Sequence, residues 1–255
     1  MIVAPIPRII RPPIPHPLGL ESGLPPDYPF LLIGAGLEGW WRFADAAHVT
    51  HSSGAISQVD DQSGNARHMT QSSALLKPDY DTSSFSRAAA AFGGGQELKN
   101  AALAAAMPTN NFSTWAVFQC DDTSTSQAIL SVASTGGYGI GIESAKWTDR
   151  HKGVATLDDG AANTSFHWIG TVRISGTEHM LIDGVEVTLA SSTGGVGALS
   201  GDSFLGALVT GVFPFVGWIF EAGAVSRVLT GGAPGVGNPV TGEWALLNTY
   251  VNTFY

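Results

Sequence analysis

The sequence is poor in cysteine and lacks long apolar runs. Its 255 residues contain one cysteine, Cys120, so no disulfide can form within the chain and a disulfide-stapled scaffold is excluded. No apolar run reaches the roughly 18 residues of a membrane-spanning helix, because glycines and Pro214 interrupt the longest candidate, 204–220. Prolines interrupt the N-terminal apolar stretch as well, which predicts that no signal peptide is present.

Positive charge is scarce too. Twelve Lys and Arg residues stand against 21 Asp and Glu, which gives a formal net charge of −9 and a pI of about 5.1. The basic residues are scattered, whereas phosphate recognition requires clustered Lys and Arg. We therefore expect no nucleic-acid partner and no membrane insertion, and a chain that is soluble or belongs to a soluble assembly.

The prolines set the first 29 residues apart from the rest. Nine of the 14 prolines lie before residue 30. Proline fixes φ and lacks an N–H, so this segment can neither form a helix nor pair fully in a sheet, and it is predicted to be extended. A disordered tail is one interpretation, and an arm docked on a partner is the other. The apolar side chains favour docking, and we expect the anchoring contacts from Ile6, Arg8, Ile9, Ile10, Arg11 and Ile14.

From residue 30 onward the pattern indicates β structure. Short β-branched and aromatic runs between turn residues predict strands at 112–120, 128–132, 138–143, 166–174, 179–182, 203–208 and 218–225. Asp183-Gly184 predicts a two-residue hairpin. Helical spacing occurs at 100–107 and 242–254. Residues 30–255 are therefore predicted to form an all-β, two-sheet antiparallel jelly-roll sandwich with a short C-terminal helix, preceded by the Pro-rich arm.

Motifs for catalysis are weak. Gly34-x-Gly36-x-x-Gly39 has the spacing of a dinucleotide fingerprint, but no helical stripe follows it, which favours a glycine-rich lead-in to the first strand. No Gly-x-Ser-x-Gly elbow is present. The acidic pairs Asp183/Glu186 and Asp121/Asp122 lie at predicted turns, where they do not face one substrate. The sequence predicts no catalytic residue and a protein that is not an enzyme.

Two polar clusters are candidate binding sites. The first cluster consists of Asp60, Asp61 and Asn65. It forms either a tight turn, in which these side chains bond their own backbone, or a calcium site. No other cofactor is expected. Trp147 stands among Lys146, Asp149 and Arg150 in a predicted polar loop. Because a flat ring covers the apolar face of a pyranose, Trp147 is the candidate carbohydrate platform, unless it packs against its own loop.

Several motifs occur in a fixed order along the chain. They are Gly39-Trp40-Trp41, Val59-Asp60-Asp61-Gln62-Ser63-Gly64-Asn65, Lys77-Pro78, the 91–98 and 181–187 segments, Phe215–Glu221 and the final 244–254 segment. This ordered set resembles the concanavalin A-like, laminin-G-like domains common in bacteriophage structural proteins. The resemblance covers about residues 35–255 and implies a jelly-roll sandwich used for carbohydrate or surface adhesion.

These features together predict a non-enzymatic virion structural protein of a phage tail, baseplate or capsid surface. Residues 1–29 would anchor it to other virion proteins in a symmetric assembly, after synthesis in the host cytoplasm, and the sandwich would face host-surface glycans. The alternative is a stand-alone carbohydrate-binding module or a jelly-roll glycoside hydrolase. A hydrolase needs two carboxylates about 5–9 Å apart in a cleft, and no spacing in the sequence guarantees such a pair.

Overall fold

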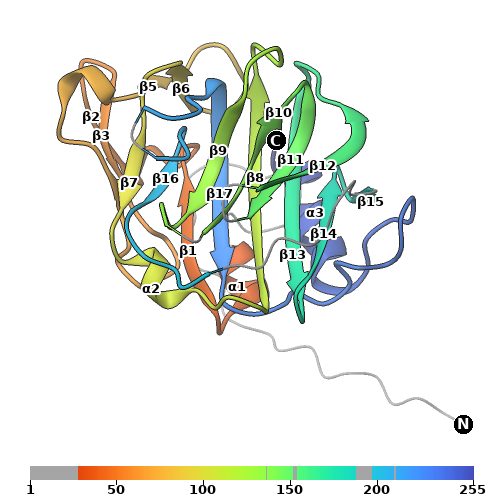
Figure 1. Ribbon diagram of the computed structural model, residues 1–255. Helices are drawn as coiled ribbons and strands as arrows, with labels where there is room; N and C mark the ends of the chain where they lie inside the picture. The colour runs from red at the N-terminus through yellow and green to blue at the C-terminus, as the bar shows by residue number, and fades with distance from the viewer. Residues whose placement is uncertain (1–27, 136, 152–153, 188–196, 210) are drawn as a thin grey trace, which may run out of the picture.

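The computed structural model describes residues 28–135, 137–151, 154–187, 197–209 and 211–255. Antiparallel strands stack in two layers, and a helix covers the outer face of one layer (Figure 1). The predicted all-β sandwich with a C-terminal helix is thus confirmed. The residues predicted to anchor the arm, Ile6, Arg8, Ile9, Ile10, Arg11 and Ile14, lie outside the described residues.

One layer is built around two long apolar strands, β8 and β17. In spatial order it contains β15 (Val185–Val187), β14 (Thr177–Ile182), β13 (Phe166–Ile174), β8 (Phe112–Cys120) and β17 (Val216–Val225), then β6 (Ala89–Gly93) and β1 (Leu37–Arg42) beside the two halves of β17, with β5 (Asp79–Asp81) beyond β6. The Asp183-Gly184 hairpin joins β14 to β15 as predicted, and both turn residues have positive φ.

The second layer contains the remaining strands. In order these are β12 (Val154–Ala161), β11 (Lys146–His151), β10 (Tyr138–Glu143), β9 (Gln127–Val132), β16 (Ser203–Leu205), β7 (Leu98–Asn100), β4 (Met69–Thr70), β3 (Ala55–Val59) and β2 (Val49–Ser52). Strand β3 also pairs with β5 through Ala55 and Asp79. Hydrogen bonding therefore continues from one layer into the other at this edge.

Strand β8 is buried on both faces, and its side chains alternate between two hydrophobic cores. Ala116 and Phe118 belong to the core between the layers. Trp115 and Val117 belong to a second core on the helix side. This period-two alternation is the basic geometry of a strand. Each large apolar side chain buried in this way contributes roughly 1.5–3 kcal/mol to folding.

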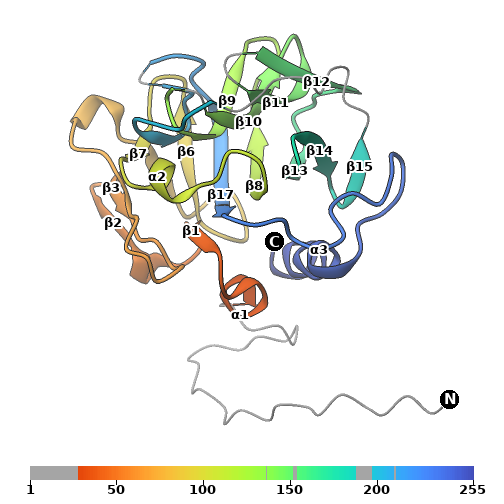
Figure 2. The same ribbon diagram turned by 60° about the horizontal axis from the view of Figure 1, so that its bottom comes forward.

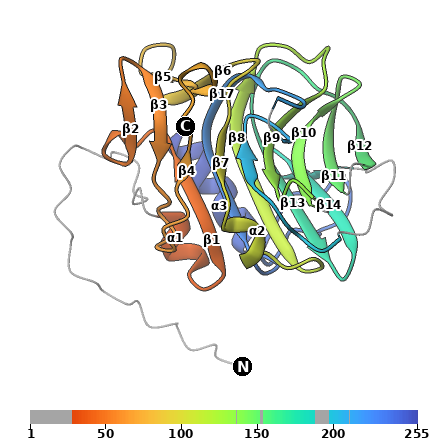
Figure 3. The ribbon, with the colours of Figure 1, turned by 60° about the vertical axis from the view of Figure 1, so that its left-hand side comes forward.

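The second core lies between the β8–β17 layer and two helices, α3 (Gly242–Phe254) and α1 (Tyr28–Ile33), which Figure 2 shows side by side beneath the strands. Trp244 of α3 stacks on Trp168 with ring centroids 5.7 Å apart. A Cβ at Gly170 would lie 2.5 Å from the Trp244 ring, so only glycine permits this approach. Figure 3 shows α3 on the side of the β17–β8 layer away from β9 and β10.

Two local predictions differ from the structure. The helix predicted at 100–107 is only α2 (Leu103–Ala106), because β7 extends to Asn100 and its side-chain oxygen caps the amides of Ala102 and Leu103. The glycine-rich segment before β1 is followed by a strand, as the favoured interpretation required. Within the described ranges no helix combines the length and the apolar character needed to cross a membrane.

Candidate functional site

A β-bulge in β17 turns two neighbouring side chains toward the helix side. The register against β8 shifts between Ile219, which pairs with Phe118, and Glu221, which pairs with Val117. As a result, Phe220 packs in the helix-side core and Glu221 bonds to side chains of the same side. Bulges re-aim side chains in this way and are frequent beside functional sites.

Glu221 is fully buried and accepts three side-chain hydrogen bonds. Its Oε1 accepts from Trp115 Nε1 at 3.2 Å. Its Oε2 accepts from the hydroxyls of Tyr250 and Tyr255, each at 2.8 Å. Arg42 lies opposite Glu221 in the β1–β17 pairing and is itself buried, with its guanidinium bonded to Asp45 at 3.0 Å. The carboxylate thus ties the sheet to α3 and to the residue that follows it.

Burial governs the ionisation of this cluster. Burial raises the pKa of Glu221, and the nearby Arg42 charge only partly opposes that effect. Burial, together with the Glu221 charge, also raises the pKa of Tyr250 and of Tyr255 well above the ordinary phenol value. Both phenols therefore remain protonated near neutral pH and act as hydrogen-bond donors.

An aromatic pocket of about 70 Å³ lies next to this cluster. The residues that line it come from the β5–β6 loop, the start of β13, β17 and the residue after α3: Phe85, Ser86, Arg87, Phe166, Phe220 and Tyr255. Phe85 and Phe166 meet Phe220 with ring centroids 5.0 and 5.4 Å apart. Phe166 is 37% exposed, so an apolar ring is accessible at the mouth of the pocket.

Asp81 holds the β5–β6 loop that carries Phe85 and Arg87. Its Oδ1 accepts from the backbone amides of Ser83 and Ser84 at 2.9 and 3.0 Å, and its Oδ2 accepts from Trp218 Nε1 at 2.9 Å. Burial opposes ionisation of Asp81, but these hydrogen bonds outweigh it and lower its pKa well below the usual range. The ring of Trp218 in turn meets Phe85 edge-on at 5.1 Å.

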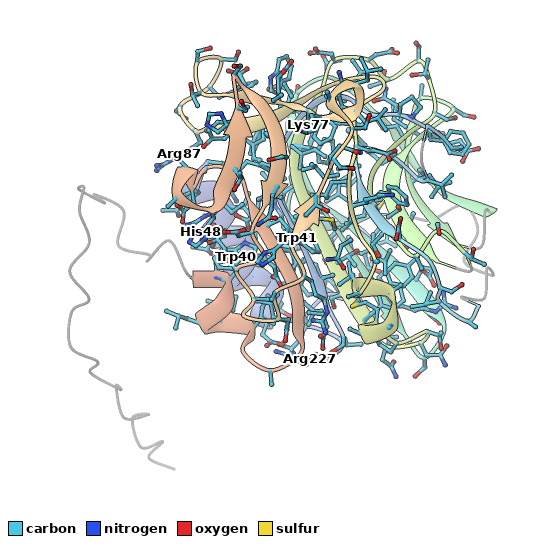
Figure 4. The ribbon with its side chains drawn as sticks, turned by 90° about the vertical axis from the view of Figure 1, so that its left-hand side faces the viewer. Trp40, Trp41, His48, Lys77, Arg87 and Arg227 are labelled. Atoms are coloured by element: carbon cyan, nitrogen blue, oxygen red, sulfur yellow. The ribbon has the colours of Figure 1, made fainter. Side chains whose placement is uncertain are left out.

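Arg87 is the only charged side chain among the residues that line the pocket. Its Nε donates to the carbonyl oxygen of Phe254 at 3.1 Å, and its guanidinium lies 4.4 Å above the Phe254 ring. Figure 4 shows Arg87 at the periphery of the molecule, apart from Lys77. Arg87 makes no ion pair with any described residue.

A second pocket is a weaker candidate. Its volume of about 10 Å³ is close to the minimum for one water molecule. Its lining carries neither an aromatic nor a charged side chain and consists of Gln127, Ala128, Gly139, Ile140, Gly141, Thr148 and Leu208. The aromatic pocket therefore has both the larger space and the chemistry for a ligand.

The prediction of an exposed platform at Trp147 is corrected by the structure. Trp147 is 2% exposed and meets Phe118 edge-on at 5.4 Å within the core between the layers. It lies in strand β11, and alternation also buries Asp149, whereas Lys146 is half-buried. The side chain of Arg150 lies outside the described part of the chain. The segment is thus a strand of the second layer rather than a polar loop.

The predicted metal ligands Asp60, Asp61 and Asn65 form a hydrogen-bonded turn. Asp61 accepts from the amides of Trp40, Ser63 and Arg67 and from the Ser63 hydroxyl, at 2.8–3.0 Å. The side-chain amide nitrogen of Asn65 donates to the Leu37 carbonyl at 2.7 Å.

Asp60 accepts from Gln58 Nε2 at 2.7 Å and lies 3.4 Å from His48. The bond from the Ser63 amide to Asp61 is the one that the tight-turn interpretation requires, whereas the shortest side-chain bonds of Asp60 and Asn65 go to groups outside the turn. No group of three or more His, Cys, Asp or Glu with metal-site geometry occurs among the residues that the structure describes.

The residues of the aromatic pocket did not emerge from the sequence patterns. One signal for Glu221 existed, because an acid within the apolar strand motif Phe215–Glu221 requires a buried partner. Phe85, Phe166 and Tyr255 come from separate segments, and only the fold brings them together.

Comparison with solved structures shows a shared fold at low sequence identity. A Trypanosoma rangeli sialidase in complex with sialic acid matches with a TM-score of 0.55 and 13% identity, over 86% of this chain and 33% of the sialidase chain. Domain 4 of AbnA, a GH43 extracellular arabinanase from Geobacillus stearothermophilus, in complex with arabinotriose, matches with a TM-score of 0.54 and 14% identity, over 76% of this chain and 94% of that chain.

This chain thus spans about a third of the sialidase. No protein-family model matches the sequence. No curated protein matches it either.

These neighbours correct the prediction that the protein is not an enzyme. They are a sialidase, matched over about a third of its chain, and one domain of an arabinanase, so this chain shares the fold of a part of each of two glycoside hydrolases. At 13–14% identity the likeness shows the fold alone. The all-β sandwich is common to both neighbours and this chain, whereas the concanavalin A-like assignment and the link to phage proteins stay predictions.

Proposed function

We propose that this chain binds carbohydrate and that the sugar is held in the aromatic pocket of Phe85, Phe166, Phe220 and Tyr255. The pocket is the observation that carries the proposal. Its accessible Phe166 ring offers a flat apolar face, and sugar rings present C–H groups that pack on such faces. Ser86 and Arg87 add the few polar groups that typically orient a ligand.

The size of the pocket defines how a sugar is held. A volume of about 70 Å³ accommodates a substituent of a sugar ring rather than the whole ring. The ring itself then lies over Phe166 at the mouth, and the substituent points inward toward Phe220 and Arg87. Two aromatic contacts at 5.4 and 6.1 Å, from Phe166 to Phe220 and to Tyr255, keep this platform in place before the ligand arrives.

The fold neighbours support a carbohydrate ligand. One is an arabinanase domain in complex with arabinotriose, and most of that domain matches this chain. The other is a sialidase in complex with sialic acid, of which about a third matches. We further propose that the sandwich is of the jelly-roll type implied by the motif order.

A glycan array followed by calorimetric titration of the best ligand tests the proposal. Phe166→Ala is expected to weaken binding about tenfold, which corresponds to about 1.4 kcal/mol. Leu75→Ala is the matched control, since Leu75 is 89% exposed and does not line the pocket. If no glycan binds the wild-type protein, or if both variants bind it equally well, the proposal is wrong.

Attachment to a virion through residues 1–29 is proposed separately and rests on the proline-rich, apolar pattern of these residues and on the resemblance to phage structural proteins. Comparing the full chain with a variant lacking residues 1–29 tests it. We expect the shortened protein to fold but to be absent from purified particles. Incorporation of both proteins at equal levels would refute the anchoring role.

A further inference from the structure

We infer that the sugar held in the aromatic pocket carries a carboxylate, as in a uronic or ulosonic acid, and that Arg87 binds this group. The inference rests on the proposed function and specifies its ligand class. It follows from the hydrogen-bond donors and acceptors of the pocket, from the two terminal nitrogens of Arg87 and from the contacts that hold Arg87 in place.

The polar side chains that line the pocket are suited to an acceptor-rich group. They are Ser86, Arg87 and Tyr255, and none of the lining residues is acidic. The Tyr255 hydroxyl already donates to Glu221 at 2.8 Å. A guanidinium has five N–H donors and no acceptor. A ligand group that only accepts hydrogen bonds therefore fits better than hydroxyls, which also need acceptors.

Arg87 differs from the paired arginines of the molecule. Arg67 donates to Glu38 at 2.8 Å, and Arg227 donates to both oxygens of Glu243 at 2.6 and 3.0 Å. Only the Nε of Arg87 has a hydrogen-bond partner among the described residues, the Phe254 carbonyl. Its two terminal nitrogens are thus available as a fork, which is the geometry that binds a carboxylate in a bidentate manner.

Arg87 is also held before any ligand binds. Its guanidinium lies over the Phe254 ring at 4.4 Å, and its loop is fixed by the hydrogen bonds of Asp81. The net charge of the whole chain is −9, and this charge repels anions at long range. Among the residues that line the pocket, Arg87 is the one cation that offsets this repulsion.

Matched ligands give the direct test. The wild-type protein is titrated with oligogalacturonate and with the methyl-esterified form of the same oligosaccharide, and with glucuronate-containing and sialylated glycans beside their methyl esters. We expect at least one acid to bind tenfold or more tightly than its ester. Equal affinity of every acid and its ester, or a preference for a sulfated sugar over all carboxylates, would overturn the inference.

Variants then assign the preference to Arg87. Arg87→Gln is expected to abolish the difference between acid and ester, and Arg87→Lys to retain only part of it, because lysine lacks the planar fork. Lys77→Gln is the matched control, because Lys77 is a cation outside the pocket. Circular dichroism checks that each variant is folded, and the acid–ester comparison in the wild type does not depend on any variant.

The outcomes separate this inference from the proposed function. One outcome is that neutral sugars and esters bind as tightly as the acids and that Phe166→Ala lowers the affinity for all of them. In that case the pocket binds sugar, and only the inference of a carboxylate-bearing ligand is wrong. If the wild-type protein binds no sugar of either kind, the proposed function itself fails.

Discussion

The two faces of the β8–β17 layer are filled in different ways. Toward β9 and β10 these strands present Ala116, Phe118 and Ala222, which pack in a core of apolar side chains between the layers. Toward the helices they present Trp115 and the buried carboxylate of Glu221. On β8 and β17 the buried charge thus lies on the helix side, whereas on the side of the second layer the sheet buries the Arg173–Glu178 ion pair of β13 and β14.

The difference follows from what covers each face. A second sheet packs face to face at a distance of about 10 Å. The helices α1 and α3 cover only part of the opposite face, and the rings of Phe85, Phe166 and Phe220 lie beyond the end of α3. The aromatic pocket lies where α3 ends at Phe254 and Tyr255 follows. The helix side of the layer thus contains both the Glu221 hydrogen bonds that join the sheet to α3 and the aromatic pocket that is proposed to hold a ligand.

The largest effect is expected from loss of the Glu221 carboxylate. Glu221→Ala leaves Arg42 buried without this counter-charge and removes the acceptor of Trp115, Tyr250 and Tyr255. We expect a loss of about 3–5 kcal/mol in the free energy of unfolding, measured by denaturant titration. A loss below about 1 kcal/mol would show that the cluster is not what ties α3 to the sheet.

Close packing on the helix side is tested by Gly223→Ala. A Cβ at Gly223 would lie 2.0 Å from the rigid ring of Trp115, so we expect a loss of about 1–3 kcal/mol. Gly95→Ala is the control, because no atom lies within 4 Å of a Cβ there, and its effect should stay within about 0.5 kcal/mol. Equal stability of the two variants would contradict the described packing.

The Tyr255 hydroxyl and ring are expected to have separate roles. Tyr255→Phe removes one of three donors to Glu221 but keeps the ring in the pocket. Unfolding should become easier by about 0.5–1.5 kcal/mol, while the affinity for the sugar changes less than twofold. A large loss of affinity in this variant, measured by calorimetry, would mean that the hydroxyl itself contacts the ligand.

Because the pKa of Glu221 is raised, the free energy of unfolding is expected to depend on pH through this residue. A carboxyl whose pKa is higher in the folded than in the unfolded state favours folding fully below the unfolded value. That contribution is lost as the pH rises through the folded pKa. Relative to Glu221→Gln, the wild-type protein should therefore lose stability as the pH rises above the ordinary carboxyl pKa of 4.5. A constant difference between the two proteins over this range would contradict the assigned direction.

The smallest effect concerns the single cysteine. Burial raises the pKa of Cys120 to about 11, and its thiol donates to the Asn163 carbonyl at 3.0 Å. The folded protein should therefore react with a thiol reagent at pH 8 far more slowly than the protein in guanidinium chloride. Equally fast reaction of both would show that Cys120 is accessible.

The sequence patterns predicted regular elements well. Strand β8, strand β13 and helix α3 have the predicted bounds, because the two strands are β-branched or aromatic runs between turn residues and the helix shows apolar residues at helical spacing. The polar residues Lys146, Asp149 and Arg150 predict a loop where the structure has strand β11. The turn before this strand, Ser144-Ala145, has φ values of 52° and 58° but contains no glycine or asparagine that would indicate a hairpin. Trp147 was therefore misplaced from the core to the surface.

The aromatic pocket could not be predicted from sequence patterns, for a different reason. Phe85, Phe166, Phe220 and Tyr255 are spread over 171 positions, and only Phe220 belongs to one of the ordered motifs of the sequence. Their meeting depends on the bulge at Phe220 and on where α3 ends, which are properties of the packed structure.

Chemical-shift mapping of the isotope-labelled protein during titration with a bound oligosaccharide tests the central claim most directly. We predict that the largest backbone shifts occur at residues 85–87 and 166, with smaller changes at Phe220 and Tyr255. Largest shifts at residues 146–150, or shifts scattered over the surface without saturation, would contradict a sugar site in the aromatic pocket.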